Sequence, residues 1–209
     1  MNLAYYYWYF QSAIPGRICD EIVRYGNQNK PSVAVTGPYQ DKKLSHKDLN
    51  DLKKTRNSNI VWLKDTWIYK EIHPYVELAN RKAGWNFEWD HSESCQFTKY
   101  KLNQYYDWHN DSWTQPYSRK DKNDPSHGKI RKLSVTVSLS DPKSYKGGEL
   151  EFDFKDRNPN KKTNIIKCKE IIPKGSIVVF PSFVWHRICP VKSGERYSLV
   201  IWNLGKPFK

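Results

Sequence analysis

The chain has 209 residues, with 35 Lys and Arg against 22 Asp and Glu and therefore a formal net charge of +13. Its aromatic content of 15% excludes an intrinsically disordered chain, and no apolar run approaches the ~20 residues of a membrane helix. The start of the chain lacks the pattern of a signal peptide and the four cysteines form no C-x-x-C pair, so we expect a cytoplasmic protein with reduced thiols and no membrane partner.

The first 84 residues are predicted to form one strand and a first helix before a long polar segment. Residues 5–12 are rich in aromatic side chains, which favour a strand. A helix should follow at Pro15, because Ile18 and Ile22 repeat at helical spacing and proline suits a first helical position. Residues 27–58 are polar and are predicted to be mostly loop.

A short strand over 59–63 and a second helix complete this N-terminal part. The helix is predicted from the apolar spacing between Ile68 and Ala83, with Asp65 as its N-cap. Pro74 lies inside the pattern and should kink the helix or delay its start.

From residue 85 onward the apolar period changes from 3.6 to 2, which predicts strands. A series of short strands after two helices indicates a mostly β chain with flanking helices, a jelly roll or double-stranded β-helix. We expect one domain over 1–209, with the strand and helices in 1–84 and the jelly-roll core in 85–209. Residues 112–129 are too polar for a core and are predicted to be a long binding loop. The strands are expected at 85–90, 93–101, 104–110, 130–140, 148–154, 165–172, 175–180, 184–190 and 195–203.

Two histidines and one aspartate are the candidate metal ligands. His109 and Asp111 are two residues apart, so on a strand they would point to the same side. His186, in a later strand, is the candidate third ligand. Two imidazoles and one carboxylate suit the open sites of iron(II) oxygenases. A zinc hydrolase, a cupin or ordinary packed histidines remain open on these residues alone.

The last strands carry polar side chains where a core would be apolar. Arg196 and Ser198 share one face of the final strand with Trp202, and a buried guanidinium needs an anionic partner such as a carboxylate. The strand near residue 135 presents a face of small hydroxyls. This face fits a wall left open for a polar ligand, or an exposed polar surface. Its members are Ser134, Thr136, Ser138 and Ser140.

The joint order of these residues resembles the 2-oxoglutarate- and iron(II)-dependent oxygenases, and within them the prolyl 4-hydroxylase branch. His186 follows His109 by 77 residues, and Arg196 follows ten residues later. The resemblance covers roughly 94–203 and extends to five further motifs. These are Gln96 to Tyr100, Gly147 to Phe152, Pro173 to Ser176, His186 to Pro190 and Gly194 to Arg196.

The resemblance implies how the site is divided. His109, Asp111 and His186 would bind iron, while Arg196 and Tyr100 would hold the C5 carboxylate of the cosubstrate 2-oxoglutarate. The site would also include Ser198, Trp202 and Ser138, the last standing where several relatives carry a tyrosine. The implied reaction is hydroxylation of a C–H bond coupled to oxidative decarboxylation of 2-oxoglutarate to succinate and CO₂, with ascorbate as a candidate helper.

The substrate expected from the resemblance is a prolyl residue of a peptide or protein. A free amino acid or small metabolite is the first alternative. Oxidative dealkylation of nucleic acid is the second. It is favoured by the +13 charge, but the dealkylating relatives usually carry a second arginine where this chain has Trp202. A non-catalytic binding domain on the same scaffold would not need the intact ligand set.

Side chains beside the ligands and in the long loop are the candidates for substrate contact. They are Trp108, Trp113, Tyr117, Trp185 and Arg187. For Trp185, packing in the core is an equal alternative. The sequence indicates no oligomeric state.

Overall fold

The computed structural model describes residues 3–33, 45–154 and 165–208. Three helices and fifteen strands lie in these residues, so the expected mostly β architecture with flanking helices is confirmed. The helices are α1 (Gly16–Gln28), α2 (His46–Thr55) and α3 (Thr66–Lys82). The strands are β1 (Trp8–Phe10), β2 (Ser32–Val33), β3 (Arg56–Asn57), β4 (Asn59–Leu63), β5 (His91–Ser92), β6 (Cys95–Tyr100), β7 (Tyr105–His109), β8 (Ile130–Ser138), β9 (Tyr145–Gly147), β10 (Leu150–Asp153), β11 (Ile165–Lys167), β12 (Ile177–Pro181), β13 (Trp185–Ile188), β14 (Val191–Gly194) and β15 (Arg196–Gly205).

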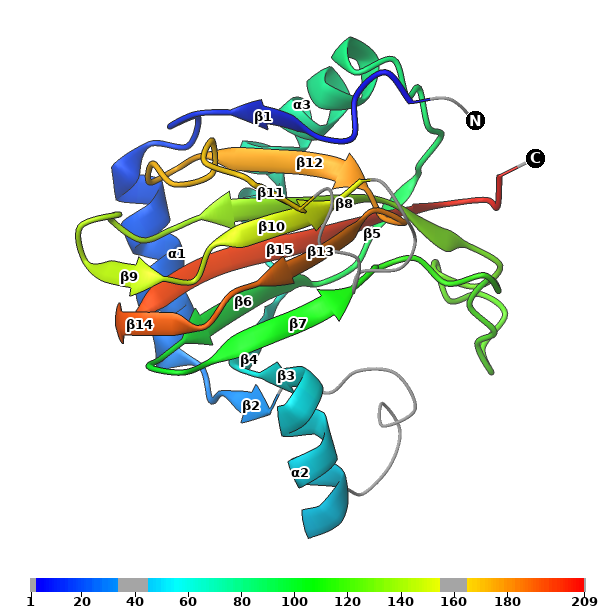
Figure 1. Cartoon of the computed structure of the whole chain (residues 1–209). Coiled ribbons are helices and arrows are strands. Elements are labelled where there is room, and N and C mark those ends of the chain that lie inside the picture. Colours follow the sequence, from blue (N-terminus) through cyan, green and yellow to red (C-terminus); the bar gives the residue numbers. More distant parts are fainter. Residues whose placement is uncertain (1–2, 34–44, 155–164, 209) are drawn as a thin grey trace.

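Two antiparallel sheets face each other, as expected for a jelly roll (Figure 1). Within the described part of the chain, the major sheet has the order β1-β12-β8-β15-β6-β4-β2, with β5 paired to β15. The minor sheet has the order β11-β10-β13-β7-β3. Strands β9 and β14 form a separate hairpin-like pair at one end (Figure 1).

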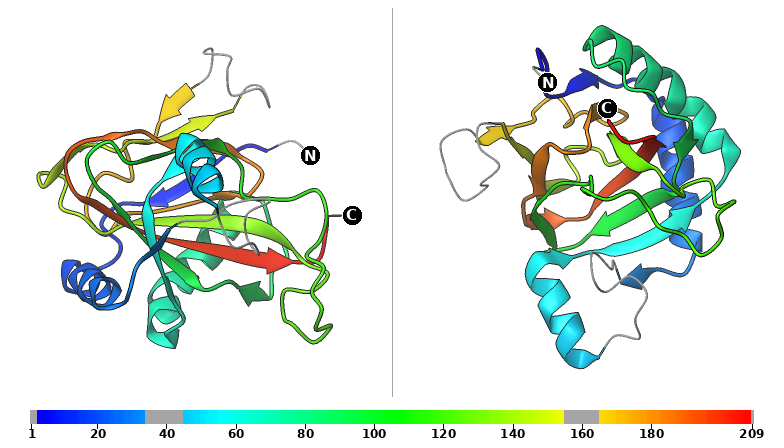
Figure 2. Two further views of the ribbon diagram at one scale, coloured as in Figure 1. Left: turned by 90° about the horizontal axis from the view of Figure 1, so that it is seen from below. Right: turned by 90° about the vertical axis from the view of Figure 1, so that its right-hand side faces the viewer.

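The first core lies between the major sheet and two helices. α1 and α3 cover the outer face of this sheet (Figure 2). The helices bury apolar residues at helical spacing, such as Ile22 and Ile72, against alternate strand residues such as Val135 and Ile201. These period-3.6 and period-2 patterns are the signals that the sequence carries, which is why both helices and the sheet follow from it.

The second core lies between the two sheets. Phe152 of β10 and Phe180 of β12 are fully buried there, with ring centroids 5.1 Å apart. Alternation along each strand sends one side chain toward the helices and the next toward the opposite sheet. The side of β8 and β15 that carries hydroxyls and Arg196 therefore faces the space between the sheets, and the functional site lies in this space.

The prediction of a loop over 27–58 is wrong for a large part of its length. The helix α2 spans His46–Thr55, and β2 and β3 add short strands, while 34–44 lie outside the described residues. Ser45 and Asp48 form a reciprocal capping box at the start of α2. The helix buries Leu52 among polar neighbours, so it shows almost no apolar period that sequence reasoning could use.

Asp65 stands at the N-cap position of the second predicted helix as expected, but other predictions for this region and the first β segment differ from the structure. Pro74 does not delay α3, which begins at Thr66. Asp65 occupies the N-cap position of α3 without capping it, because its side chain accepts a hydrogen bond from Tyr25 Oη instead (3.2 Å). The strand expected at 85–90 is absent there; a short strand, β5, follows at His91–Ser92. The pair β9–β14 was missed because its strands are short and mostly exposed.

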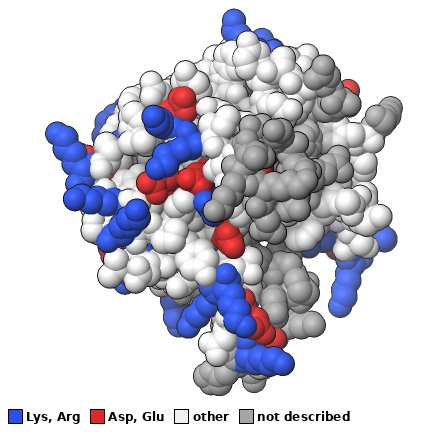
Figure 3. Space-filling model, in the orientation of Figure 1, with Lys and Arg blue, Asp and Glu red and all other residues white. Residues whose placement is uncertain are grey.

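The charge is distributed over the surface. On the face shown in Figure 3, basic side chains stand in several groups with acidic side chains among them. Some of these charges are paired across the minor sheet, as Lys167 is with Glu149 (3.0 Å) and Arg187 with Glu151 (2.8 Å). None of the helices that the structure describes combines the length and apolar character needed to span a bilayer.

Candidate active site

A cavity between the two sheets, here called the central cavity, contains the candidate metal ligands. Both sheets contribute to its walls, so its shape depends on strands that are far apart in sequence. Its lining residues are Gln96, Tyr100, Tyr106, His109, Asp111, Thr136, Leu150, His186, Ile188, Ser198, Val200 and Trp202.

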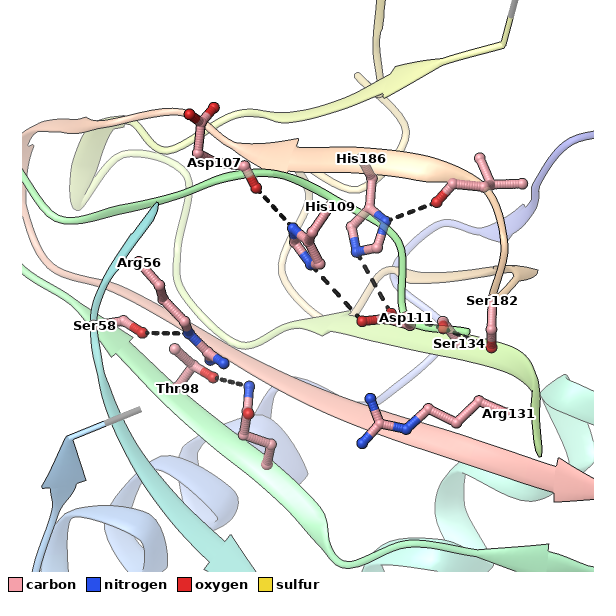
Figure 4. A network of polar contacts seen from close by, with 12 residues as sticks. Arg56, Ser58, Thr98, Asp107, His109, Asp111, Arg131, Ser134, Ser182 and His186 are labelled. Atoms are coloured by element: carbon pink, nitrogen blue, oxygen red, sulfur yellow. Dashed lines mark hydrogen bonds and ion pairs between the residues drawn. The ribbon is translucent and has the colours of Figure 1, made fainter. Parts of the chain in front are cut away.

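The structure brings His109, Asp111 and His186 together. One potential ligand atom from each lies within 4.8 Å of the other two. His109 and His186 are direct cross-strand partners on β7 and β13, and their ring centroids are 4.1 Å apart. The Asp111 carboxylate completes the group, 3.8 Å from His109 Nε2 and 3.5 Å from His186 Nε2 (Figure 4).

Backbone carbonyls fix the tautomers of both imidazoles. His109 Nδ1 lies 2.7 Å from the Asp107 carbonyl oxygen, and His186 Nδ1 lies 3.0 Å from the Val184 carbonyl oxygen. A carbonyl only accepts, so each Nδ1 must donate a proton. In the neutral rings the Nε2 atoms are then unprotonated, and both point toward Asp111 (Figure 4).

The electrostatics of this group fit a bound cation. Burial and then repulsion from His186 hold the pKa of His109 well below its usual value, which keeps the ring neutral. Burial raises the pKa of Asp111, but attraction to His186, His109 and Arg131 outweighs it and lowers the pKa to about 2. Two imidazole lone pairs and an ionised carboxylate therefore converge. All three are electron-pair donors of the kind that iron(II) accepts.

Asp111 reaches this position by a route other than strand alternation. We expected a strand to carry both residues of the H-x-D pair, but β7 ends at His109. Asp111 lies in the bend that follows, where its backbone N–H donates to the Ser182 carbonyl oxygen (2.8 Å). The side chain is fixed by Ser134, whose hydroxyl lies 2.8 Å from Asp111 Oδ2.

Arg196 lies in the same region, buried and without a carboxylate partner. Its side chain is 3% exposed, and no described carboxylate lies within 4 Å of its guanidinium. It donates to Ser198 Oγ (3.2 Å), and its Cζ lies 5.5 Å from the ring centroid of Tyr100, its cross-strand partner. Ser138 lies beside Ser198 across β8 and β15. Tyr100, Ser198 and Trp202 line the central cavity, as the sequence predicts.

An ion pair between buried Arg131 and partly buried Glu93 supports the far wall of the cavity. Arg131 donates to both carboxylate oxygens of Glu93 (2.8 and 2.6 Å), and its guanidinium lies 3.8 Å from the ring of Trp202. Tyr117, from the long loop, donates its hydroxyl to the same Glu93 (2.9 Å). Tyr117 therefore anchors the loop to this ion pair and does not line the central cavity.

The remaining candidates for substrate contact lie outside the central cavity. Trp108 is adjacent to the ligand His109 on β7, and Trp185 and Arg187 flank the ligand His186 on β13, so they point to the outer face of the minor sheet. Arg187 lies over the Trp108 ring (4.6 Å) and pairs with Glu151. Trp113 is 44% exposed on the loop after Asp111.

Sequence reasoning missed a stack of side chains behind His109. The Tyr106 ring lies nearly parallel to the His109 ring, with centroids 3.5 Å apart. The Arg56 guanidinium lies over the Tyr106 ring, 4.4 Å from its centroid. Arg56 is 4% exposed and bonds Ser58 Oγ through Nε (3.0 Å). Tyr106 lies in the strand predicted over 104–110, but Arg56 falls in the segment predicted as loop.

Trp62 is a second residue that the sequence did not indicate. It pairs across β4 and β6 with Gln96, which lines the central cavity, and it is 46% exposed. Its ring lies 6.2 Å from that of Trp202. An exposed indole therefore stands beside the rim of the cavity.

Comparison with known proteins places these residues in a family context. Residues 95–203, just over half of the chain, match the 2OG-Fe(II) oxygenase superfamily. A PKHD-type hydroxylase from Hyphomonas neptunium is 46% identical over 71 residues, which are 34% of this chain and 27% of that protein. The matched stretches cover between 27% and 43% of the first three curated relatives.

Two solved structures share the fold over nearly the whole chain. The viral collagen prolyl hydroxylase of Paramecium bursaria Chlorella virus-1, in complex with 2OG, has a TM-score of 0.63 at 21% identity and covers 97% of both chains. A prolyl hydroxylase from Trichoplax adhaerens, bound to a peptide fragment of hypoxia inducible factor, has a TM-score of 0.65 at 14% identity and covers 96% of this chain and 84% of that one. At these identities the likeness concerns the fold.

Proposed function

Because the chain belongs to the 2OG-Fe(II) oxygenase superfamily, we propose that it is a dioxygenase that hydroxylates a prolyl residue of a peptide or protein. The observation that carries the proposal is that two features lie between the same two sheets. One is the His-Asp-His group, and the other is a buried arginine that has no carboxylate partner among the described residues. The first group suits iron(II), and the second suits the distal carboxylate of 2-oxoglutarate.

Each part of the site has a separate task. His109, Asp111 and His186 hold iron(II), with the imidazoles oriented by the carbonyls behind them. Arg196 binds the C5 carboxylate, with Ser198 and Tyr100 beside it. Iron(II) and 2-oxoglutarate supply the oxygen chemistry: decarboxylation to succinate and CO₂, coupled to hydroxylation of a C–H bond. The protein contributes orientation and a buried setting, and no side-chain acid or base is required.

The rim of the cavity favours a prolyl substrate. Trp62 and Trp202 stand on neighbouring parts of the major sheet, with ring centroids 6.2 Å apart, and Trp62 is open to solvent. Aromatic side chains are the usual binding surfaces for proline-containing segments. Trp202 also occupies the place where an arginine would favour nucleic acid dealkylation, so the structure gives that alternative no added support.

The test is a succinate-release assay with Fe(II) and 2-oxoglutarate, run against proline-containing peptides, free proline and oligonucleotides. We expect substrate-dependent succinate and a mass gain of one oxygen on the peptide. Trp62→Ala should raise the peptide KM at least several-fold and leave the 2-oxoglutarate KM unchanged. Turnover of the free amino acid or the oligonucleotide, with none of the peptide, would refute the assignment of the substrate.

The Gly-Gly turn before β10 gives a further test of the arginine site. Gly148 has a φ of +66°, and a Cβ there would lie 2.8 Å from Arg196 Cδ. Gly84 has a similar φ of +70° but open space around it, which makes it a matched control. Both alanine variants should lose about 1–2 kcal/mol of unfolding free energy in urea, from the left-handed backbone. Only Gly148→Ala should also weaken 2-oxoglutarate binding, since it displaces Arg196. Equal 2-oxoglutarate affinity in both variants would contradict this site.

A further inference from the structure

We propose that Ser134, supported by Ser182, is a positioning residue that holds the Asp111 carboxylate in its metal-binding orientation. The inference rests on the proposed function, because it takes Asp111 as an iron ligand. It also assigns a role to Ser134, a member of the row of small hydroxyls on β8 that the cosubstrate and ligand assignments leave unexplained.

The two serines form a directed hydrogen-bond chain to Asp111. Ser134 Oγ lies 2.8 Å from Asp111 Oδ2 and 2.9 Å from Ser182 Oγ. A carboxylate that binds a metal ion is ionised and can only accept hydrogen bonds. The Ser134 hydroxyl therefore donates to Asp111, and the Ser182 hydroxyl donates to Ser134. This chain uses one lone pair of Oδ2, while Oδ1 is the carboxylate oxygen that faces His109 Nε2 (3.8 Å).

Ser182 also holds the backbone of the same residue. Its carbonyl oxygen accepts from Asp111 N–H (2.8 Å) and from Ser112 N–H (3.0 Å). Its own N–H donates to the Lys132 carbonyl oxygen (2.9 Å), which ties this turn to β8. Asp111 needs such support because it lies beyond the end of β7, in a bend without strand pairing. The two serines therefore hold Asp111 at both places: Ser182 holds its backbone and Ser134 holds its carboxylate (Figure 4).

Ser134, which bonds the Asp111 carboxylate, lies on a rigid strand. Ser134 sits in the middle of the major sheet, paired on one side with Phe180 of β12 and on the other with Trp202 of β15. Ser134 and Ser182 are both fully buried, so a hydroxyl at either place must find a partner inside the protein. A ligand held through such a strand loses little freedom when it binds a metal.

The test measures Mn(II) affinity of the full-length protein by electron paramagnetic resonance, with unfolding midpoints measured in parallel. Loss of an outer partner of a metal ligand typically costs 10–100-fold in metal affinity, and we expect that loss for Ser134→Ala. Ser182→Ala should cost less, because the bond to Asp111 remains. The double variant should bind no more weakly than Ser134→Ala, since the Ser182 hydroxyl acts only through Ser134 and the backbone carbonyl of residue 182 remains in both variants. Ser134→Thr retains the hydroxyl and should bind more tightly than Ser134→Ala.

Ser140→Ala is the matched control. Ser140 belongs to the same hydroxyl face and is buried, but it accepts from Tyr197 N–H (2.7 Å) and does not contact Asp111. It should leave Mn(II) affinity unchanged even where it lowers the unfolding midpoint. An equal loss of affinity in Ser140→Ala and Ser134→Ala would overturn the proposal.

The result for His186→Ala separates this inference from the assignment of the metal site. If His186→Ala loses Mn(II) binding while Ser134→Ala and Ser182→Ala stay within twofold of wild type, the positioning role is wrong and the metal site stands. If His186→Ala binds Mn(II) as wild type does, the metal site is wrong and the inference falls with it. Should Ser134→Ala not fold, Ser182→Ala still decides: Mn(II) affinity within twofold of wild type would overturn the positioning role, and a larger loss that Ser140→Ala does not share supports it.

Discussion

Replacing Asp111 by alanine is expected to abolish iron binding and turnover while the protein remains folded. The carboxylate supplies the only negative charge of the His-Asp-His group, and its removal leaves two neutral imidazoles whose ring centroids are 4.1 Å apart. His109→Ala should act in the same way. The ligand atoms face the central cavity and not a packed core, so the fold does not depend on them. Anaerobic Fe(II) titration measures the loss, and circular dichroism measures the fold.

His127→Ala is the matched control for this prediction. His127 lies in the long loop, where its Nδ1 accepts a hydrogen bond from Arg119 N–H (3.0 Å), and it is not part of the central cavity. It should bind Fe(II) as wild type does. Full turnover of 2-oxoglutarate by Asp111→Ala would show that the iron site lies elsewhere.

The sequence predicts which residues form the His-Asp-His group, because that group consists of a few residues in a fixed order. His109 and His186 are adjacent only because β7 pairs with β13, a fact that spacing alone does not contain. The resemblance to known oxygenases, which rests on the order of the ligands and the arginine, implied that the two histidines lie together. The sequence also singles out Arg196 on physical grounds, since a charge at the start of a strand that is otherwise buried requires a partner.

The supporting residues could not be predicted in the same way. Arg56 stacks on Tyr106 through the pairing of β3 with β7, two short strands without an apolar pattern. Ser134 was visible only as one of four small hydroxyls, with nothing to separate it from Ser140. Their roles depend on which side chains the folded sheets bring into contact. Tyr117 is a further example, because this loop residue bonds the partly buried Glu93, a contact that its place in the sequence does not indicate.

The second large effect is expected for Arg196→Met, which should weaken 2-oxoglutarate binding by roughly thirty-fold or more while iron affinity stays nearly unchanged. Methionine keeps much of the side-chain length and bulk in a place that is 3% exposed, but it removes the guanidinium fork. Losing a buried charge-assisted pair costs about 2–5 kcal/mol, much of it from the stranded carboxylate. A loss of about 2 kcal/mol corresponds to the thirty-fold change, since 1.4 kcal/mol is tenfold in affinity.

Arg196→Lys separates charge from geometry at this position. A lysine ammonium retains the positive charge but not the planar pair of donors, so it should recover part of the affinity lost in Arg196→Met. An anaerobic titration of 2-oxoglutarate, followed by the absorption band of the iron complex, measures all three proteins. Wild-type affinity in Arg196→Met would mean that the arginine serves the fold or the substrate. In that case its bond to Ser198 Oγ, at 3.2 Å, would be the contact that explains its burial, and the cosubstrate would have to be held by other residues.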